Sequence, residues 1–314
     1  MVDLRYGAVL RPEWSSEIVR EEHPSDGASV YTVHAAVAES LSKDCYSSEP
    51  LILLHGVGNS GAVYGPMLGC FAELGPVMAP TMSPELLSTG ADSKDDAVGR
   101  LVEWLAEVAA PPWRLVGHSM GGILTGLILR THPDVVSSAV LLNAPLPGTI
   151  ERLRTGNSLD RNGRALLAMK GLARITSFGR PRLPRFLRGT ELAIVRAGLA
   201  GFVANPMALD GRVISRAILR SRTTDGIDFL RMARELPIWE SDPFSLCPVQ
   251  IIQGDDDPLV PMSDHDAVVD AYPTAAVHVI SQCGHFAHLE QPGLTLELIS
   301  KFYARLESGD VLGA

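Results

Sequence analysis

The fold of this 314-residue chain is decided by residues 114–122, which read RLVGHSMGG. A short β-rich run leads into Ser119 and a helical pattern leads out of it, so the serine stands on a sharp strand-to-helix turn. Gly117 and Gly121 flank it in the pattern G-x-S-x-G, where side chains would clash as the chain bends. The stretch therefore predicts a serine hydroxyl exposed above the end of a strand.

Short apolar runs alternate with amphipathic helical patterns on both sides of this turn. A continuous apolar run such as Leu51–Leu54 is typical of a strand buried on both faces of a parallel sheet. We expect strands at 29–37, 50–56, 77–81, 114–116, 139–142, 249–253 and 277–281, and helices at 95–108, 120–131, 264–271 and 293–306. This order predicts an α/β fold with a mostly parallel central sheet and helices on both faces.

The alternation stops between residues 145 and 240, where Arg-rich helical stretches are broken by Gly and Pro. We expect the N-terminal part of the core at 1–144, an inserted helical lid at 145–240 and the C-terminal part of the core at 241–314. The predicted lid has seventeen basic and eight acidic residues, a net charge of +9, which leaves −18 on the rest. This uneven distribution of charge has two interpretations. The predicted lid is a solvated surface that pairs electrostatically with the acidic core, or it attracts an anionic substrate.

Composition excludes several classes of protein. The chain is 46% hydrophobic and 20% charged, as globular proteins are, and its formal net charge of −9 argues against nucleic acid as a partner. Residues 1–14 lack the apolar core of a signal peptide, and no run approaches the roughly 20 apolar residues of a membrane span. Four cysteines are too few for a disulfide scaffold and lack zinc-site spacing. We therefore expect a cytoplasmic protein.

The C-terminal part supplies the partners that a serine nucleophile needs. A serine hydroxyl becomes reactive when a histidine takes its proton and a carboxylate orients that histidine. GDDDP follows one predicted strand at residues 254–258, and GH follows another at residues 284–285. Since the carboxyl ends of parallel strands meet at one edge of a sheet, we expect these groups beside Ser119. The carboxylate candidates are Asp255, Asp256 and Asp257.

Four segments together resemble the α/β-hydrolase superfamily: LLHGVG, LVGHSMGG, GDDDPLVP and CGHFAHLEQP. The resemblance runs from about Leu51 to Leu306, apart from the lid. In this superfamily the acid stands three residues after the strand-ending glycine, and the catalytic histidine follows a glycine. The resemblance therefore implies a catalytic triad of Ser119, Asp257 and His285.

The resemblance also implies an oxyanion hole, a pair of donors for the negative charge that develops on a carbonyl oxygen. The donors would be the backbone N–H groups of Val57 and Met120. The residues expected to bind substrate or to support the triad from behind are His55, Gly56 and His118.

The implied activity is cleavage of an ester or thioester through an acyl-enzyme. The expected substrate is small to medium in size and apolar, and it is anionic if the basic lid attracts it. Two alternatives stay open: a cofactor-free C–C bond hydrolase or lyase with the same triad, and a non-catalytic ligand-binding protein of the same fold.

His288 stands three residues after His285, but no ligand cluster supports a metal site. Cys283 has no cationic partner to make it a thiolate. We expect no cofactor and no metal, and a small-molecule substrate, with an acyl-carrier or CoA-linked substrate as a further candidate.

Overall fold

The computed structural model of the chain describes the segments that form its core. The described residues are 18–22, 29–33, 47–57, 59–82, 94–145, 196, 199–209, 211, 247–264, 270 and 272–309. Most of the predicted lid lies outside the described residues, and so do residues 34–37 and most of the predicted helix at 264–271.

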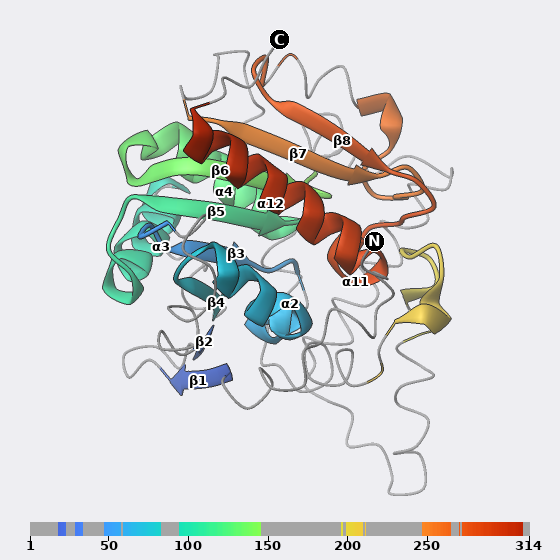
Figure 1. Cartoon of the computed structure of the whole chain (residues 1–314), viewed down its shortest axis with the longest axis horizontal. Helices are drawn as coiled ribbons and strands as arrows, with labels where there is room; N and C mark the ends of the chain where they lie inside the picture. Colours follow the sequence, from blue (N-terminus) through green and yellow to red (C-terminus); the bar gives the residue numbers. More distant parts are fainter. Residues whose placement is uncertain are drawn as a thin grey trace, which may run out of the picture.

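A single eight-stranded sheet forms the centre of the described structure (Figure 1). Its strands are β1 (Ile18–Glu22), β2 (Ser29–Val33), β3 (Leu51–Leu54), β4 (Val77–Thr81), β5 (Trp113–His118), β6 (Val136–Leu142), β7 (Val249–Gly254) and β8 (Ala276–Ile280). They lie in the order β1-β2-β4-β3-β5-β6-β7-β8. The first two strands are antiparallel to their neighbours, and the six from β4 to β8 are mutually parallel. The prediction of a mostly parallel sheet is confirmed.

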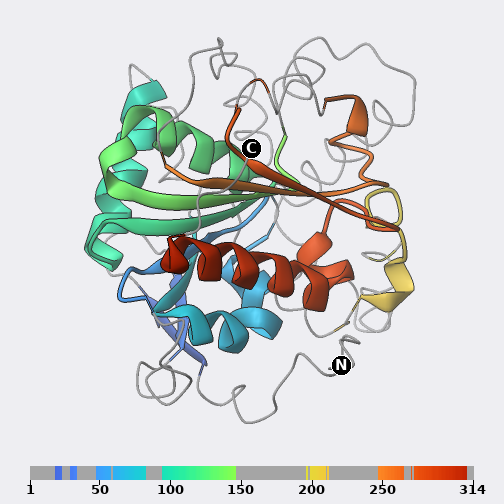
Figure 2. The ribbon, with the colours of Figure 1, turned by 45° about the horizontal axis from the view of Figure 1, so that its top comes forward.

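Helices cover both faces of this sheet, as the sequence predicted. The α-helices are α2 (Gly65–Phe71), α3 (Lys94–Val108), α4 (Met120–Thr131), α11 (Ala287–Glu290) and α12 (Pro292–Ser308). Short 3-10 helices are η2 (Gly61–Tyr64), η3 (Ala72–Leu74), η4 (Pro133–Val135), η6 (Pro206–Ala208) and η8 (Met262–Asp264). Helices α3 and α4 pack on one face, while α2 and α12 lie together on the other (Figure 2). Every residue of β3, β5 and β7 is consequently buried, which explains the uninterrupted apolar sequence LILL of β3.

The carboxyl ends of the central strands are aligned. Leu54 of β3 pairs with Gly117 of β5, and Gly117 pairs in turn with Leu141 of β6. The residues that follow these strands therefore emerge side by side, with Ser119 after β5 and Asn143 after β6. Open α/β sheets bind ligands at this edge.

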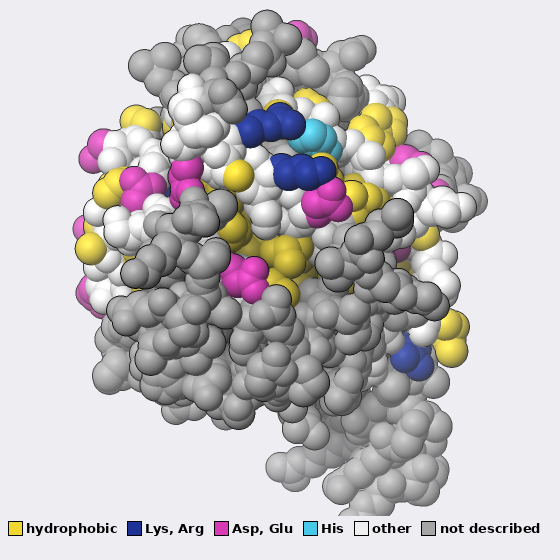
Figure 3. Space-filling model, viewed as in Figure 1, with side chains coloured by type: hydrophobic (Ala, Val, Ile, Leu, Met, Phe, Trp, Pro, Cys, Tyr) yellow, Lys and Arg dark blue, Asp and Glu magenta, His cyan; other side chains and the backbone are white. Residues whose placement is uncertain are grey.

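The face crossed by α12 carries basic side chains beside a histidine and an acidic side chain (Figure 3). Lys301 Nζ lies 2.6 Å from Glu297 Oε1 in an exposed pair one helical turn apart. Burial, together with the charges of Arg305 and Lys301, lowers the pKa of His278 on the neighbouring strand β8. Exposed pairs of this kind add little stability, and we read this surface as solvated. Within the described segments, no helix combines the length and the apolar character needed to cross a membrane.

Candidate active site

Ser119 occupies a strained turn between β5 and α4. Its φ of 53° and ψ of −116° lie outside the regions that a residue with a side chain ordinarily adopts. The turn is tight because a Cβ at Gly117 would strike the carbonyl oxygen of Gly121, and one at Gly121 would strike that of Leu54. The two flanking glycines are thus required by close backbone approach, as the sequence pattern predicted.

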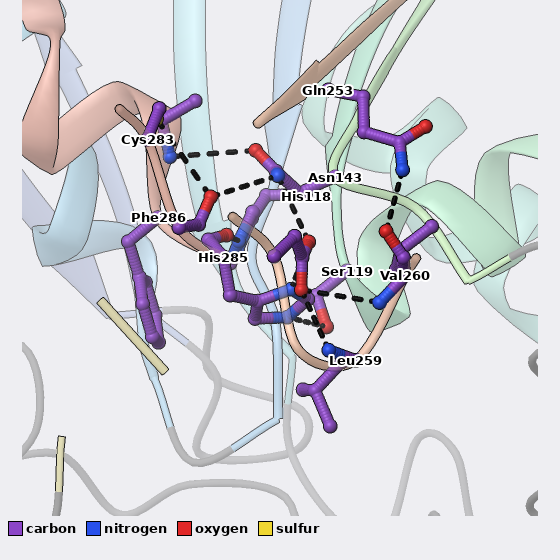
Figure 4. A network of polar contacts seen from close by, with 12 residues as sticks. His118, Ser119, Asn143, Gln253, Leu259, Val260, Cys283, His285 and Phe286 are labelled. Atoms are coloured by element: carbon purple, nitrogen blue, oxygen red, sulfur yellow. Dashed lines mark hydrogen bonds and ion pairs between the residues drawn. The ribbon is translucent and has the colours of Figure 1, made fainter. Parts of the chain in front are cut away.

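A chain of hydrogen bonds links three buried side chains from different strand ends. Ser119 Oγ lies 2.9 Å from His285 Nε2, and His285 Nδ1 lies 2.8 Å from Asp257 Oδ2 (Figure 4). An Nδ1–H that donates to the carboxylate leaves Nε2 free to accept the serine proton. This arrangement can deprotonate Ser119 and stabilise the imidazolium that results.

Asp257 is fixed by more than the histidine. Its other oxygen, Oδ1, accepts hydrogen bonds from the backbone N–H groups of Leu259 at 2.8 Å and Val260 at 3.1 Å. Asp255, two residues earlier, is exposed and its Oδ2 accepts from Ser281 Oγ at 3.0 Å. In the part of the chain that the structure describes, Asp257 is therefore the aspartate of this run whose carboxylate meets the histidine.

Asn143 belongs to the same network, and sequence reasoning missed it. Its Nδ2 donates to Asp257 Oδ2 at 3.0 Å and to the carbonyl oxygen of Gly284 at 3.1 Å, while its Oδ1 accepts from Ala287 N at 3.4 Å (Figure 4). A signal was present, because Asn143 directly follows a predicted strand at the same sheet edge as Ser119. Its amide braces both the carboxylate and the loop that carries His285.

The loop after β3 approaches Ser119 from the other side. A Cβ on Gly56 would lie 2.9 Å from His118 Nδ1 and 3.0 Å from Ser119 Cβ, so a larger residue would press on the turn. Val57 follows, half-buried, and Met120 is the first residue of α4. The two backbone N–H groups predicted to form an oxyanion hole thus belong to the two segments that meet at Ser119. Their role stays a prediction.

His55 is fixed beneath that loop in one tautomer. Met82 N–H donates to His55 Nε2 at 3.1 Å, so Nδ1 carries the hydrogen that bonds the carbonyl oxygen of Gly56 at 2.8 Å. Burial lowers the pKa of His55 to about 4, although the hydrogen bond to Gly56 by itself raises that pKa. His55 is therefore neutral near pH 7 and holds the loop in place.

His118 and His288 form a second neutral layer behind the triad. Their ring centroids lie 4.4 Å apart in an edge-to-face arrangement, and His118 Nε2 lies 2.8 Å from the carbonyl oxygen of His285. Burial and the neighbouring histidines lower the pKa of His118 well below its ordinary value, and burial lowers that of His288 to about 3. Both rings are therefore neutral, and they support the site by packing, to which His118 adds its hydrogen bond to His285.

Neither a metal site nor a thiolate emerges beside the triad. The described residues contain no cluster of three or more His, Cys, Asp or Glu side chains placed to hold a metal ion. Burial, followed by the charges of Glu290, Asp257 and Asp255, raises the pKa of the Cys283 thiol. A thiol in that environment stays protonated and is a poor nucleophile.

Known proteins resemble this chain in sequence and in fold. A model of the alpha/beta hydrolase family matches residues 51–298. The chain is 34% identical over 98 residues to (E)-2-((N-methylformamido)methylene)succinate hydrolase of Acinetobacter baylyi, covering 30% of this chain and 37% of that protein. It is 25% identical over 214 residues to monoacylglycerol lipase abhd6-B of Xenopus laevis, covering 63% of this chain and 57% of that protein. The chain thus spans less than two thirds of the length of either relative.

Similarity of fold extends further than similarity of sequence. The solved structure of an E-2-(acetamidomethylene)succinate hydrolase superposes with a TM-score of 0.62 at 17% identity, covering 91% of this chain and 98% of that one. At this identity the match concerns the fold alone.

Proposed function

Since the chain belongs to the alpha/beta hydrolase family, we propose that it is a serine hydrolase that cleaves an ester or thioester through an acyl-enzyme. The observation that carries the proposal is the hydrogen-bonded series Ser119–His285–Asp257, with Oγ–Nε2 and Nδ1–Oδ2 distances of 2.9 and 2.8 Å. The strained turn at Ser119 supports it, because such strain persists where it serves a function.

In the first half of the proposed reaction, Ser119 Oγ attacks the acyl carbon and His285 Nε2 takes the hydroxyl proton. The carbonyl π electrons move onto oxygen, where the N–H groups of Val57 and Met120 would stabilise the negative charge. Each such donor is typically worth about 3 kcal/mol to the transition state. The oxyanion then collapses, the bond to the leaving group breaks, and the alcohol or thiol departs with the proton from His285.

In the second half, water attacks the acyl-enzyme. His285 takes a proton from the water, the carbonyl re-forms, and the carboxylic acid leaves as Ser119 recovers its proton. Asp257 holds the imidazole in the tautomer that both halves need. No metal or cofactor is needed for this sequence of steps.

The ester class is supported by the relative from Xenopus laevis that is named a monoacylglycerol lipase, because monoacylglycerols are esters. The relative from Acinetobacter baylyi is instead named as a hydrolase of (E)-2-((N-methylformamido)methylene)succinate, which is not an acylglycerol. Cleavage of a C–C bond would use the same Ser119 and His285, and no observation in the structure favours it over ester hydrolysis.

We also propose that residues 145–240 form a helical lid that selects the substrate. The support is the sequence alone, namely the interruption of the α/β pattern and the net charge of +9 in this range. A positive segment would attract a carboxylate, a CoA thioester or an acidic carrier. Neutralising arginines within it should then reduce kcat/KM and its dependence on salt for an anionic ester more than for a neutral one.

Covalent labelling tests the proposed activity. Wild-type protein should react with a fluorophosphonate at Ser119, detected by mass spectrometry of the modified peptide. It should also hydrolyse a short-chain p-nitrophenyl ester, whereas Ser119→Ala should do neither. A panel of monoacylglycerols, thioesters and β-diketones then separates ester, thioester and C–C cleavage. A Ser119→Ala variant with full activity would exclude the mechanism, and an unreactive wild type would favour a ligand-binding protein.

A further inference from the structure

Glu290 stands at the end of α11, and three backbone N–H groups converge on its carboxylate. Oε2 accepts from Ala204 N at 2.7 Å and from Gly284 N at 3.1 Å, and Oε1 accepts from Phe286 N at 3.1 Å. Two of these donors flank His285 in the chain, one on each side. The third belongs to residues 199–209, which lie between β6 and β7, within the range of the predicted lid.

Residues 199–209 also contact the loop of His285 directly. His285 N donates to the carbonyl oxygen of Phe202 at 2.7 Å. A Cβ on Gly284 would lie 2.5 Å from that same oxygen and 2.7 Å from Val203 Cα, so the two backbones touch with no space for a side chain. Phe202 and Val203 are both buried. The backbone N–H groups of residues 284–286 are therefore all held, two by Glu290 and that of His285 by Phe202.

The carboxylate suits this position because the three backbone groups that hydrogen-bond to it are all donors. Burial raises the pKa of the Glu290 carboxyl, while the three N–H groups and His285 act against that rise. Bonds from N–H groups to an ionised carboxylate are stronger than bonds between neutral partners. An amide of the same shape would have to turn its NH₂ group toward at least one backbone N–H, leaving two donors opposed.

We propose that Glu290 is a positioning residue, whose carboxylate ties residues 199–209 to the backbone around His285 and so couples this part of the predicted lid to the reactivity of Ser119. The inference rests on the proposed triad. Its physical basis is that the Oγ–Nε2 contact of 2.9 Å depends on where the His285 backbone sits. Displacement of a catalytic group by about 1 Å can cost about a hundredfold in rate. Glu290 itself does not reach the reacting atoms and acts through His285.

Glu290→Gln is the direct test, and Glu297→Gln is its matched control, because Glu297 is exposed on α12 and pairs with Lys301. Two rates are measured: kcat/KM for a short p-nitrophenyl ester and the second-order rate constant for fluorophosphonate labelling. We expect Glu290→Gln to lower both about tenfold or more, with labelling still reaching one probe per chain. Glu297→Gln should stay within about twofold of wild type.

The final stoichiometry of labelling separates positioning from folding. Slow labelling that still reaches one probe per chain means that folded molecules carry a misplaced histidine, as proposed. A loss that appears only as fewer labelled chains, with a lower melting temperature, would mean that Glu290 merely supports folding. That result overturns the inference, as does a Glu290→Gln variant with wild-type rates.

Hydrogen exchange gives a readout that does not depend on catalysis. Glu290→Gln should accelerate exchange at the amides of residues 199–209 and 284–286 together. Faster exchange in only one of these two segments would contradict the proposal that Glu290 couples them. A wild-type protein that neither hydrolyses the ester nor takes up the probe would instead contradict the proposed function, and the exchange data would still decide whether Glu290 joins the two segments.

Discussion

The side-chain amide of Asn143 donates to the same carboxylate oxygen of Asp257 that accepts from His285, at 3.0 and 2.8 Å. Asn143 holds this position with a φ of 46°, in the left-handed region that residues with side chains seldom adopt. The bond restrains the orientation of the Asp257 carboxylate, to which the imidazole of His285 is hydrogen-bonded. Asn143 is thus a candidate supporting residue of the triad.

Removing this amide should slow the enzyme without abolishing it. We expect Asn143→Ala to lower kcat/KM by roughly tenfold. A hydrogen bond to a charged group is worth about 1.5–3 kcal/mol, and part of that loss raises the free energy of the transition state. The measurement is steady-state hydrolysis of a p-nitrophenyl ester. Asn143→Gly separates the amide from backbone strain, because glycine adopts the positive φ freely. A glycine variant as active as wild type would contradict a role for the amide.

Asp257 and Asp255 should differ sharply in their effect on catalysis. Asp257→Asn is expected to lower kcat by about 10³–10⁴, because an amide in place of the carboxylate favours the wrong tautomer of His285. Asp255→Asn is the matched control, since its carboxylate meets Ser281 at the surface, and it should change kcat by less than about twofold. Equal losses in the two variants would contradict the assignment of Asp257.

Close packing at the turn predicts a stability difference between two glycines in helices. A Cβ at Gly121 would strike the backbone carbonyl of Leu54, which cannot move without distorting β3. Gly121→Ala should therefore lower the free energy of unfolding by about 1–3 kcal/mol or more. Gly99 lies in α3 with nothing within 4 Å of an added Cβ, so Gly99→Ala should raise it by about 0.5–1 kcal/mol. Urea unfolding measures both, and a harmless Gly121→Ala would disprove the close contact.

Two buried histidines should make the fold sensitive to acid. In the unfolded chain each would bind a proton near its ordinary pKa of 6.5, whereas burial lowers the pKa of His55 to about 4 and that of His288 to about 3. The unfolded state therefore binds more protons as the pH falls below about 6.5, and stability is lost toward the folded-state values. At pH 5 each residue should account for a loss of about 2 kcal/mol.

A variant of His288 isolates its share of this effect. Neither of its ring nitrogens has a hydrogen-bond partner among the described residues, so leucine of similar volume removes the titration without breaking a bond. We expect His288→Leu to lose about 2 kcal/mol less than wild type between pH 7 and pH 5. Urea unfolding across this range provides the test. An unchanged pH dependence would mean that His288 is protonated in the fold.

Several elements could be predicted from residues close together in the sequence. The strand β4, Val77–Thr81, and the helix α4, Met120–Thr131, have the predicted bounds, and the buried strand β3 follows from its uninterrupted apolar run LILL. The strand β1 was missed, because IVREE lacks the apolar run by which the other strands were found. Helix α2 was missed too; its seven residues include two glycines and a proline, which disfavour helices in sequence-based prediction.

The sequence by itself determined the strand-turn-helix around Ser119, the alternation of strands and helices along the chain and the glycines that the turn requires, because these depend on local backbone sterics and on apolar periodicity. It also brought Ser119, His285 and three aspartates to one sheet edge. The resemblance to the α/β-hydrolase superfamily already pointed to Asp257, and the tertiary structure added the contacts, in which Asp257 Oδ2 lies 2.8 Å from His285 Nδ1 while Asp255 Oδ2 accepts from Ser281. The contacts of Asn143 with Asp257 and of Glu290 with Ala204 join residues 114 and 86 positions apart. No periodicity or local spacing encodes such pairs, because they arise when separate strand ends and loops pack together.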